Sequence, residues 1–280
     1  MHTWHWHTWN DLPYLACSLL ASWPHGFFTR HWHSRSPAEL APVLAADAAV
    51  FRVKQVHGNT VLTPSDLNAA NGTGTDILLE ADGLVTEAAN QSVWVASADC
   101  VPVLIADGRR GQTAAVHAGW RGTAQRIVPT AIERLQAQGS RLEDLRVAMG
   151  PAIAGSVYQV STTVAAQVGS TILPTSALPQ AHPPAHPSTH PLTPEAIDQT
   201  LAQLRQLPDS PILADEQSGR SRLDIRRVNA LQLEQLGLTA EQVAIAPYCT
   251  YQNPDQFFSY RRQPLKQVQW SGIVSRPGQP

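Results

Sequence analysis

The feature that most constrains the fold is a pair of short apolar runs, residues 93–97 and 102–106, separated by a turn that carries Asp99 and Cys100. Short apolar runs bounded by turn residues are typical of strands buried on both faces. Asp99 and Pro102 interrupt the apolar stretch, which excludes a membrane-spanning helix here. A carboxylate placed between two buried strands needs a partner, because an unpaired buried charge is costly. The pattern therefore predicts two core strands with a polar turn between them.

The other predicted elements alternate without a regular order. Short strands are expected at residues 50–56, 84–86, 113–116, 145–149 and 243–246, and helices at 127–135, in the second half of 157–168 and at 224–237. Gly139 is a plausible C-cap for the helix at 127–135. Irregular alternation favours an α+β (mixed α/β) fold over a regular doubly wound sheet. Apolar residues make up 43% of the 280 residues, enough for one large domain or two small ones.

One segment, residues 174–194, departs from this pattern because proline recurs in it too often for a helix or a sheet. We interpret it as an exposed or mobile insertion with polyproline character. His182, His186 and His190 recur in it every four residues. They suggest a metal-binding tract, but a proline-rich loop with incidental histidines is the favoured interpretation.

Charge and targeting signals bound the partners. The formal net charge is −2, so a strongly basic face for nucleic acid or an anionic membrane is not expected. No lysine or arginine precedes Arg30, whereas a secretory signal needs a basic start. The three cysteines Cys17, Cys100 and Cys249 are widely spaced and suit a reducing compartment. We expect a cytoplasmic protein that binds neither nucleic acid nor membrane.

Three segments each place one metal-ligating side chain beside a glycine or a turn: His57, Cys100 and His117. Each alone is better explained as a hydrogen-bonded histidine or a buried small cysteine. Together they form a His2Cys set, which is a catalytic zinc composition with a fourth position left for water or substrate. The same residues also fit a cysteine nucleophile with a histidine base. The residues alone leave both interpretations open.

Two His-x-His pairs, His5 with His7 and His31 with His33, suggest a copper oxidase. A multicopper site needs many more ligands, including a cysteine flanked by histidines, and Cys100 has Asp99 and Val101 as neighbours. We interpret both pairs as parts of surface strands rich in tryptophan and histidine.

Arginines complete a possible anion site. Arg30, Arg121 and Arg261 could each bind an anionic substrate through bidentate contacts, or each could pair with a structural carboxylate. The glycines around Arg121 precede a helix, where backbone N–H groups favour phosphate. Walker A, dinucleotide-binding, zincin and cytidine-deaminase motifs are absent from the sequence.

Longer motifs around these residues resemble the polyphenol oxidoreductase (laccase-domain) family, which is better described as zinc-dependent purine nucleoside phosphorylases. They are Lys-Gln-Val-His-Gly at 54–58, Ala-Asp-Gly-Leu-Val-Thr at 81–86, Ser-Ala-Asp-Cys-Val-Pro-Val-Leu at 97–104, Val-His-Ala-Gly-Trp-Arg-Gly-Thr at 116–123 and Phe-Ser-Tyr-Arg-Arg at 258–262. The resemblance covers most of residues 23–262.

The resemblance implies a single catalytic domain over residues 1–280, with a layered mixed β-sheet core flanked by helices. It implies one zinc ion, rather than copper, on His57, Cys100 and His117. It also implies phosphorolysis of adenosine, inosine and guanosine to the free base and ribose 1-phosphate. Adenosine deamination and cleavage of methylthioadenosine are implied as further activities. The expected partners are nucleosides and phosphate, and the expected state is a monomer or weak homodimer.

Further residues are assigned roles as hypotheses. Arg30 and Arg121 would hold phosphate, Arg261 and Gln55 would contact substrate, and Phe28 or Phe258 would stack on the base. Asp99 is a catalytic candidate, although its place beside a ligand suggests that it supports the ligand.

Departures from the family pattern, such as His-Trp-His-Ser at 31–34 and Gln159, touch the edges of the pocket. They concern substrate preference more than zinc binding. The alternative functions are a Cys-His hydrolase or amidase with Cys100 as nucleophile, a non-catalytic metal-binding protein and, less favoured, a copper-dependent polyphenol oxidase.

Overall fold

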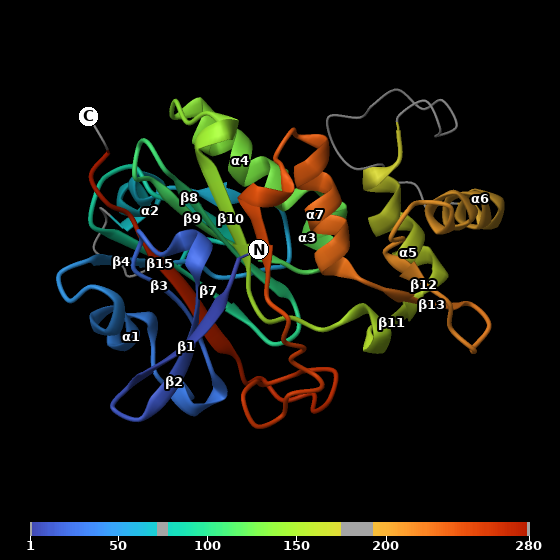
Figure 1. The fold of residues 1–280 in the computed structure, drawn as a ribbon, viewed down its shortest axis with the longest axis horizontal. Coiled ribbons are helices and arrows are strands. Elements are labelled where there is room, and N and C mark those ends of the chain that lie inside the picture. Colours follow the sequence, from blue (N-terminus) through green and yellow to red (C-terminus); the bar gives the residue numbers. More distant parts are fainter. Residues whose placement is uncertain (1, 72–77, 175–192, 279–280) are drawn as a thin grey trace.

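The computed structural model describes residues 2–71, 78–174 and 193–278. Its core is two six-stranded sheets, with a three-stranded sheet at one side (Figure 1). The first sheet has the order β1 (Trp4–Trp9), β2 (Leu12–Cys17), β3 (His25–Phe28), β15 (Gln269–Val274), β7 (Gln91–Ser97), β4 (Ala49–Arg52). Its pairings are antiparallel except for the parallel pair β4–β7. The first sheet is therefore mixed.

The second sheet contains the strands on both sides of the candidate ligands. Its order is β14 (Val243–Ile245), β10 (Leu145–Met149), β8 (Val101–Asp107), β9 (Thr113–Ala118), β6 (Gly83–Val85), β5 (Val61–Leu62). β8 pairs antiparallel with β9 and β10, whereas β10–β14 and β5–β6 are parallel. The chain passes from the first sheet to the second in the turn between β7 and β8. That turn contains Cys100.

The two sheets pack face to face, and the alternation of side chains along each strand explains why. Along β8, Leu104 faces the first sheet and shares a cluster with Val95 and Phe27. The alternating residues Val103 and Ile105 belong to the cluster on the opposite face. Because successive side chains of a strand point to opposite faces, β8 must be covered on both sides. This is why its sequence is almost continuously apolar.

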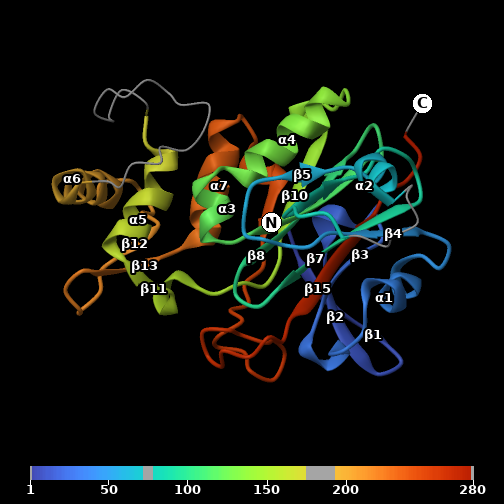
Figure 2. The same ribbon diagram turned by 180° about the vertical axis from the view of Figure 1, so that it is seen from behind.

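Helices cover the outer faces of the two sheets (Figure 2). The outer face of the second sheet packs on α4 (Ile127–Ala137) and α7 (Ile225–Gln235), with α3 (Trp120–Ala124) beside them. α1 (Pro37–Leu44) packs on the outer face of the first sheet, over Phe28 and Trp94. α2 (Pro64–Asn71) follows β5. Short 3-10 helices occupy Ser18–Leu20, Arg30–Trp32, Leu142–Asp144, Gly155–Val157, Ser170–Ile172 and Ala240–Gln242.

A side module is formed by the three-stranded sheet and two helices. It consists of β11 (Gln159–Ser161), β13 (Arg220–Leu223) and β12 (Ile212–Leu213) with α5 (Thr162–Gly169) and α6 (Pro194–Arg205). Its apolar cluster includes Val228 of α7, which joins the module to the core. Figures 1 and 2 both show it at one end of the molecule, beyond α7. The whole is an α+β fold with layered mixed sheets between helices, as the sequence predicts.

Several predicted elements are confirmed, and one strand is shorter than predicted. The strand at 145–149 has the predicted bounds, and α7 begins after Asp224, whose side chain accepts hydrogen bonds from the backbone of Arg226 and Arg227. Gly139 follows α4 with φ +95°, the left-handed conformation that favours glycine after a helix. The strand predicted at 50–56 ends at Arg52, because its pairing with β7 stops there and Lys54 forms a bridge with Glu80 instead.

The His-x-His pairs have different structures. His5 and His7 lie on the exposed strand β1, as predicted. His31 and His33 do not lie on a strand, because the chain turns through the 3-10 helix Arg30–Trp32 at this point. The insertion predicted at 174–194 lies outside the described residues for positions 175–192. None of the helices in the described ranges combines the length and apolar character needed to cross a bilayer.

Candidate metal centre

The folding of both sheets brings His57, Cys100 and His117 together. His57 lies in the loop after β4, Cys100 in the turn between β7 and β8, and His117 in β9 opposite Pro102 of β8. One ligand atom from each residue lies within 4.8 Å of the others. Within residues 2–71, 78–174 and 193–278, no other group of three or more histidine, cysteine or acidic side chains forms such a cluster.

Asp82 holds this cluster in place, and we did not predict its role. Its fully buried carboxylate accepts hydrogen bonds from the backbone N–H groups of Val56 (3.1 Å), His57 (2.9 Å) and Gly58 (2.7 Å). It also accepts one from Nδ1 of His117 at 2.9 Å.

These contacts fix both the loop and the histidine ring. His57 has φ +62°, a backbone conformation that a non-glycine residue keeps only when its surroundings hold it. Donation from Nδ1 of His117 leaves Nε2 for a metal, which is how a carboxylate orients a ligating histidine. The sequence signal was the motif at 81–86, but nothing in it indicated which residues Asp82 would contact.

The electrostatics of the cluster favour a thiolate at Cys100. Burial by itself would raise the pKa of the Cys100 thiol, but the charge and hydrogen bonds of His117 and His57 lower it to about 6. Burial by itself would lower the pKa of His117, but Cys100 and Asp82 together raise it. The thiolate is the form of cysteine that binds metals and the form that acts as a nucleophile.

Gly119 leaves room for an ion between the ligands. A Cβ atom at this position would lie 3.0 Å from Sγ of Cys100 and 3.3 Å from Cδ2 of His57. The donor set of two imidazoles and one thiolate matches known three-residue zinc sites. The ligand atoms lie within 4.8 Å of one another, so they would close by about 1 Å to reach the separation of about 3.5 Å around tetrahedral zinc. The residues present therefore fit a borderline divalent metal ion.

Asp99 ties a distant segment to the metal centre. Its Oδ1 accepts a hydrogen bond from the hydroxyl of Thr250 at 2.6 Å, and its Oδ2 accepts one from the backbone N–H of Arg261 at 2.7 Å. The carboxylate is buried, and the backbone has φ +99°. Since both oxygens already accept hydrogen bonds, Asp99 fits a supporting role better than that of a base.

Two of the predicted cations lie near the metal centre. The Arg261 guanidinium lies 5.1 Å from the centre of the Tyr158 ring, and the exposed Arg121 stacks on Trp120 at 4.4 Å. Burial raises the pKa of the Tyr158 phenol, Cys100 adds to this effect, and the two arginines oppose it. Tyr158 therefore lies within electrostatic reach of both the thiolate and the arginines.

The remaining predicted residues have other contacts. Arg30 donates to the carbonyl oxygen of Pro254 at 2.6 Å and stacks on the buried ring of Phe258. The Gln55 amide both donates to and accepts from the backbone of Ala96. Phe28 is 1% exposed, in the cluster beneath α1. None of these contacts brings Arg30, Gln55 or Phe28 to the metal ligands.

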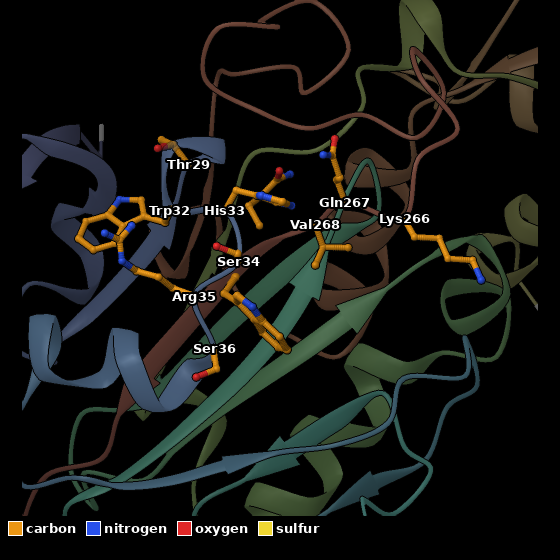
Figure 3. Close-up of a pocket in the computed structure, with 11 residues that line it drawn as sticks. Thr29, Trp32, His33, Ser34, Arg35, Ser36, Lys266, Gln267 and Val268 are labelled. Carbon is orange, nitrogen blue, oxygen red and sulfur yellow. The ribbon is translucent and has the colours of Figure 1, made fainter.

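A cavity of about 240 Å³ lies between the segment 29–36 and the segment 266–270. Figure 3 shows Arg35 lying against Trp32 and Lys266 extending away from the loop. His33 lines this cavity, but His57, Cys100 and His117 do not. It is therefore separate from the metal centre.

The chain is similar to known proteins both in sequence and in structure. A family model described as multi-copper polyphenol oxidoreductase laccase matches residues 34–189 and 182–272. The chain is 46% identical over 272 residues to a purine nucleoside phosphorylase of Synechocystis sp., and the match covers 97% of each chain. It is 26% identical to an adenosine deaminase from an unknown prokaryotic organism, over 65% of this chain and 56% of that protein.

Among solved structures, the fold is similar to that of YlmD from Geobacillus stearothermophilus. The TM-score is 0.73 with 23% sequence identity, and the match covers 97% of this chain and 98% of the other. At this identity the likeness concerns the fold alone.

Proposed function

The chain belongs to the family described as multi-copper polyphenol oxidoreductase laccase, and from this premise we propose that it is a zinc-dependent purine nucleoside phosphorylase. The observation that carries the proposal is its 46% identity, over 97% of both chains, to a relative named purine nucleoside phosphorylase. The His57–Cys100–His117 cluster supports a metal-dependent site. We propose zinc rather than copper because a single His2Cys cluster is a zinc composition.

The reaction would cleave the bond between C1′ of the ribose and N9 of the purine. An oxygen of inorganic phosphate forms the new bond to C1′, and the electron pair of the broken bond leaves with the purine, which takes up a proton. The products are the free base and ribose 1-phosphate. The transition state carries positive charge on the ribose, so an anion held beside C1′ lowers the barrier.

Each residue of the proposed site has a distinct task. His57, Cys100 and His117 would hold zinc, which when bound supplies Lewis-acid polarisation of a substrate oxygen. Arg121 and Arg261 would bring positive charge for the phosphate. Asp99 would hold the backbone of Arg261 beside Cys100. Asp82 would orient His117 and the loop of His57.

The wider proposal extends to activities, location and assembly. The relative named adenosine deaminase supports deamination of adenosine as a second activity, and we include methylthioadenosine among the substrates. We expect residues 1–280 to act as one catalytic domain in the cytoplasm. The expected partners are nucleosides and phosphate, and the expected state is a monomer or weak homodimer.

A second candidate is a Cys-His hydrolase or amidase, which one observation favours. The pKa of Cys100 is lowered to about 6 beside His117, and this is also the arrangement of an activated cysteine nucleophile. Treatment with iodoacetamide separates the two functions. Zinc held by the thiolate would protect Cys100 from alkylation, whereas alkylation of the zinc-replete protein would favour the hydrolase.

The decisive experiment is chromatographic detection of products from inosine and adenosine. Zinc-loaded protein is incubated with and without phosphate, next to Cys100→Ala and a Cys17→Ala control, whose site lies in the core between the sheets. Phosphate-dependent release of hypoxanthine or adenine, lost only in Cys100→Ala, is the expected result. Inosine formed from adenosine without phosphate would make deamination the main reaction. No product from either nucleoside would refute the proposal.

A further inference from the structure

A second cavity, of about 220 Å³, lies where the side module meets the segment 251–261. Residues of the segment 156–159, of β13 and of the 251–261 segment line it, among them Arg222, Arg261 and Tyr251. We propose that this cavity binds the phosphate co-substrate between Arg222 and Arg261. The inference rests on the proposed phosphorolysis, and it gives Arg222 a role that the sequence did not suggest.

The two guanidinium groups are anchored to the same short segment. Nη1 of Arg222 donates to the carbonyl oxygen of Ser156 at 2.8 Å, and Nη1 of Arg261 donates to that of Gln159 at 2.8 Å. Arg222 is also the cross-strand partner of Gln159 in the β11–β13 pair. Anchored arginines lose little further side-chain entropy when they bind an oxyanion.

Each arginine retains donors for a ligand. Nε of Arg222 donates to Asp215, but its Nη2 has no hydrogen-bond partner among the described residues. Nε and Nη2 of Arg261 likewise have no hydrogen-bond partner among the residues that the structure describes. Phosphate oxygens fit such guanidinium donors well, because the contact combines charge with directed hydrogen bonds.

The cavity has an excess of positive charge. Its lining holds two arginines and one carboxylate, so it carries one net positive formal charge. The carboxylate, Asp215, is 3% exposed and accepts hydrogen bonds from Arg222, from the Gln159 side chain and from the backbone of Gln217. Because its two oxygens already accept these three bonds, it holds Arg222 in place. An anion is therefore the ligand that the lining favours.

Arg261 connects the cavity to the metal centre. Its backbone N–H donates to Asp99, the residue before Cys100, and its guanidinium covers the ring of Tyr158. Gln159, the next residue, lines the cavity. Arg30 does not line this cavity. His57, Cys100 and His117 do not line this cavity either, so Arg261 and the segment 158–159 are its link to the metal centre.

The test uses the zinc-loaded full chain and the variant Arg222→Gln. Phosphate is titrated at saturating inosine, and inosine is titrated at saturating phosphate. We expect the KM for phosphate to rise about 10- to 100-fold from the loss of a charge-assisted contact, while the KM for inosine changes less than about threefold. Arg222→Lys keeps the charge and should recover part of the loss. Arg227→Gln, which removes a cation bound to the carbonyl oxygen of Asp209, should match the wild type.

Binding of inorganic phosphate measured by calorimetry gives a readout independent of turnover. Phosphate should bind to the wild type and to Arg227→Gln and bind at least tenfold more weakly to Arg222→Gln. Thermal unfolding of Arg222→Gln checks that this variant is folded. If it is not folded, the phosphate affinity of Arg222→Lys is compared with that of the wild type instead.

The outcomes separate this inference from the proposed function. Equal phosphate affinity in Arg222→Gln and the wild type would overturn the inference. Binding of inosine 5′-monophosphate at Arg222 in place of inorganic phosphate would also overturn the inference. Phosphate binding that depends on Arg222 in a protein that releases no base would refute phosphorolysis and retain the anion site.

Discussion

Replacing Asp82 with asparagine is expected to weaken zinc binding 10- to 100-fold while all three ligands remain. Oδ1 of Asp82 accepts hydrogen bonds from the backbone of His57 and from Nδ1 of His117, and Oδ2 accepts them from Val56 and Gly58. An asparagine side chain keeps one of these oxygens and turns the other into an NH2 group, which accepts nothing. Whichever way the amide faces, two donors lose their acceptor.

The magnitude follows from these two donors. Each buried donor left without an acceptor costs about 1–3 kcal/mol, so the free energy of unfolding should fall by about 2–6 kcal/mol. The loop of His57 is partly exposed, so water should satisfy some of its N–H groups and bring the loss to the lower half of this range. Loss of the partner that orients a ligating histidine typically reduces metal affinity 10- to 100-fold.

The assay compares metal affinity and stability in matched variants. Zinc affinity is measured by competition with a chelating dye, and Co²⁺ substitution reports the ligand geometry through its absorption spectrum. Asp107→Asn is the control, because Asp107 is also fully buried and accepts two backbone hydrogen bonds at Oδ1, while its Oδ2 has no partner among the described residues. It should keep wild-type zinc affinity. An Asp82→Asn variant with wild-type affinity and an unchanged Co²⁺ spectrum would refute the role of Asp82.

Three further predictions concern the space between the candidate ligands, the charge of Cys100 and the core beneath α1. Gly119→Ala should lower zinc affinity at least tenfold because its Cβ would meet Sγ of Cys100, whereas Gly58→Ala, with its nearest neighbour at 3.7 Å, should not; equal affinities in the dye assay would contradict this. In metal-free protein, alkylation of Cys100 by iodoacetamide should rise with a midpoint near pH 6. An alkylation midpoint above pH 8 would disprove the thiolate. The lowered pKa also means that the thiolate's contribution to stability is complete above the ordinary pKa of a cysteine thiol and is lost as the pH falls through about 6. Phe28→Ala should lower the free energy of unfolding by about 3–5 kcal/mol in a denaturant titration without changing zinc affinity. A change in the KM for inosine with no loss of stability would instead place Phe28 at the substrate.

Local patterns carried much of the fold prediction. The apolar runs beside Asp99 and Cys100 became β7 and β8 because strands buried on both faces need apolar residues at nearly every position. The helix at 224–237 was readable from its periodicity and its N-cap. The short strand β4 was predicted too long, because its pairing with β7 ends at Arg52 and Lys54 forms a bridge with Glu80 instead. That contact joins residues far apart in the sequence, and local periodicity contains no information about it.

The candidate site, like the fold, was only partly predictable from the sequence. The candidate ligands, His57, Cys100 and His117, were predicted from residue types and motifs in the sequence, and the structure brings them together. The roles suggested for Arg30 and Phe28 were not separable from structural ones, since an arginine or a phenylalanine has the same local sequence signal in either role. The contacts of Arg30 with Pro254, and the enclosure of Phe28 beneath α1, depend on segments that meet only in the folded chain.

The sequence by itself determined which side chains can hold a metal, which runs must be buried and which class of fold can bury them. These properties depend on residue type and on spacing along the chain, and both are local. Only the tertiary structure decided that Asp82 orients His117, that Asp99 ties Arg261 to the metal centre and that Arg222 and Arg261 share one cavity. These contacts arise from the packing of the two sheets and from the side module beside α7. A hydrogen bond between distant segments has no local signal, because its geometry exists only after the chain has folded.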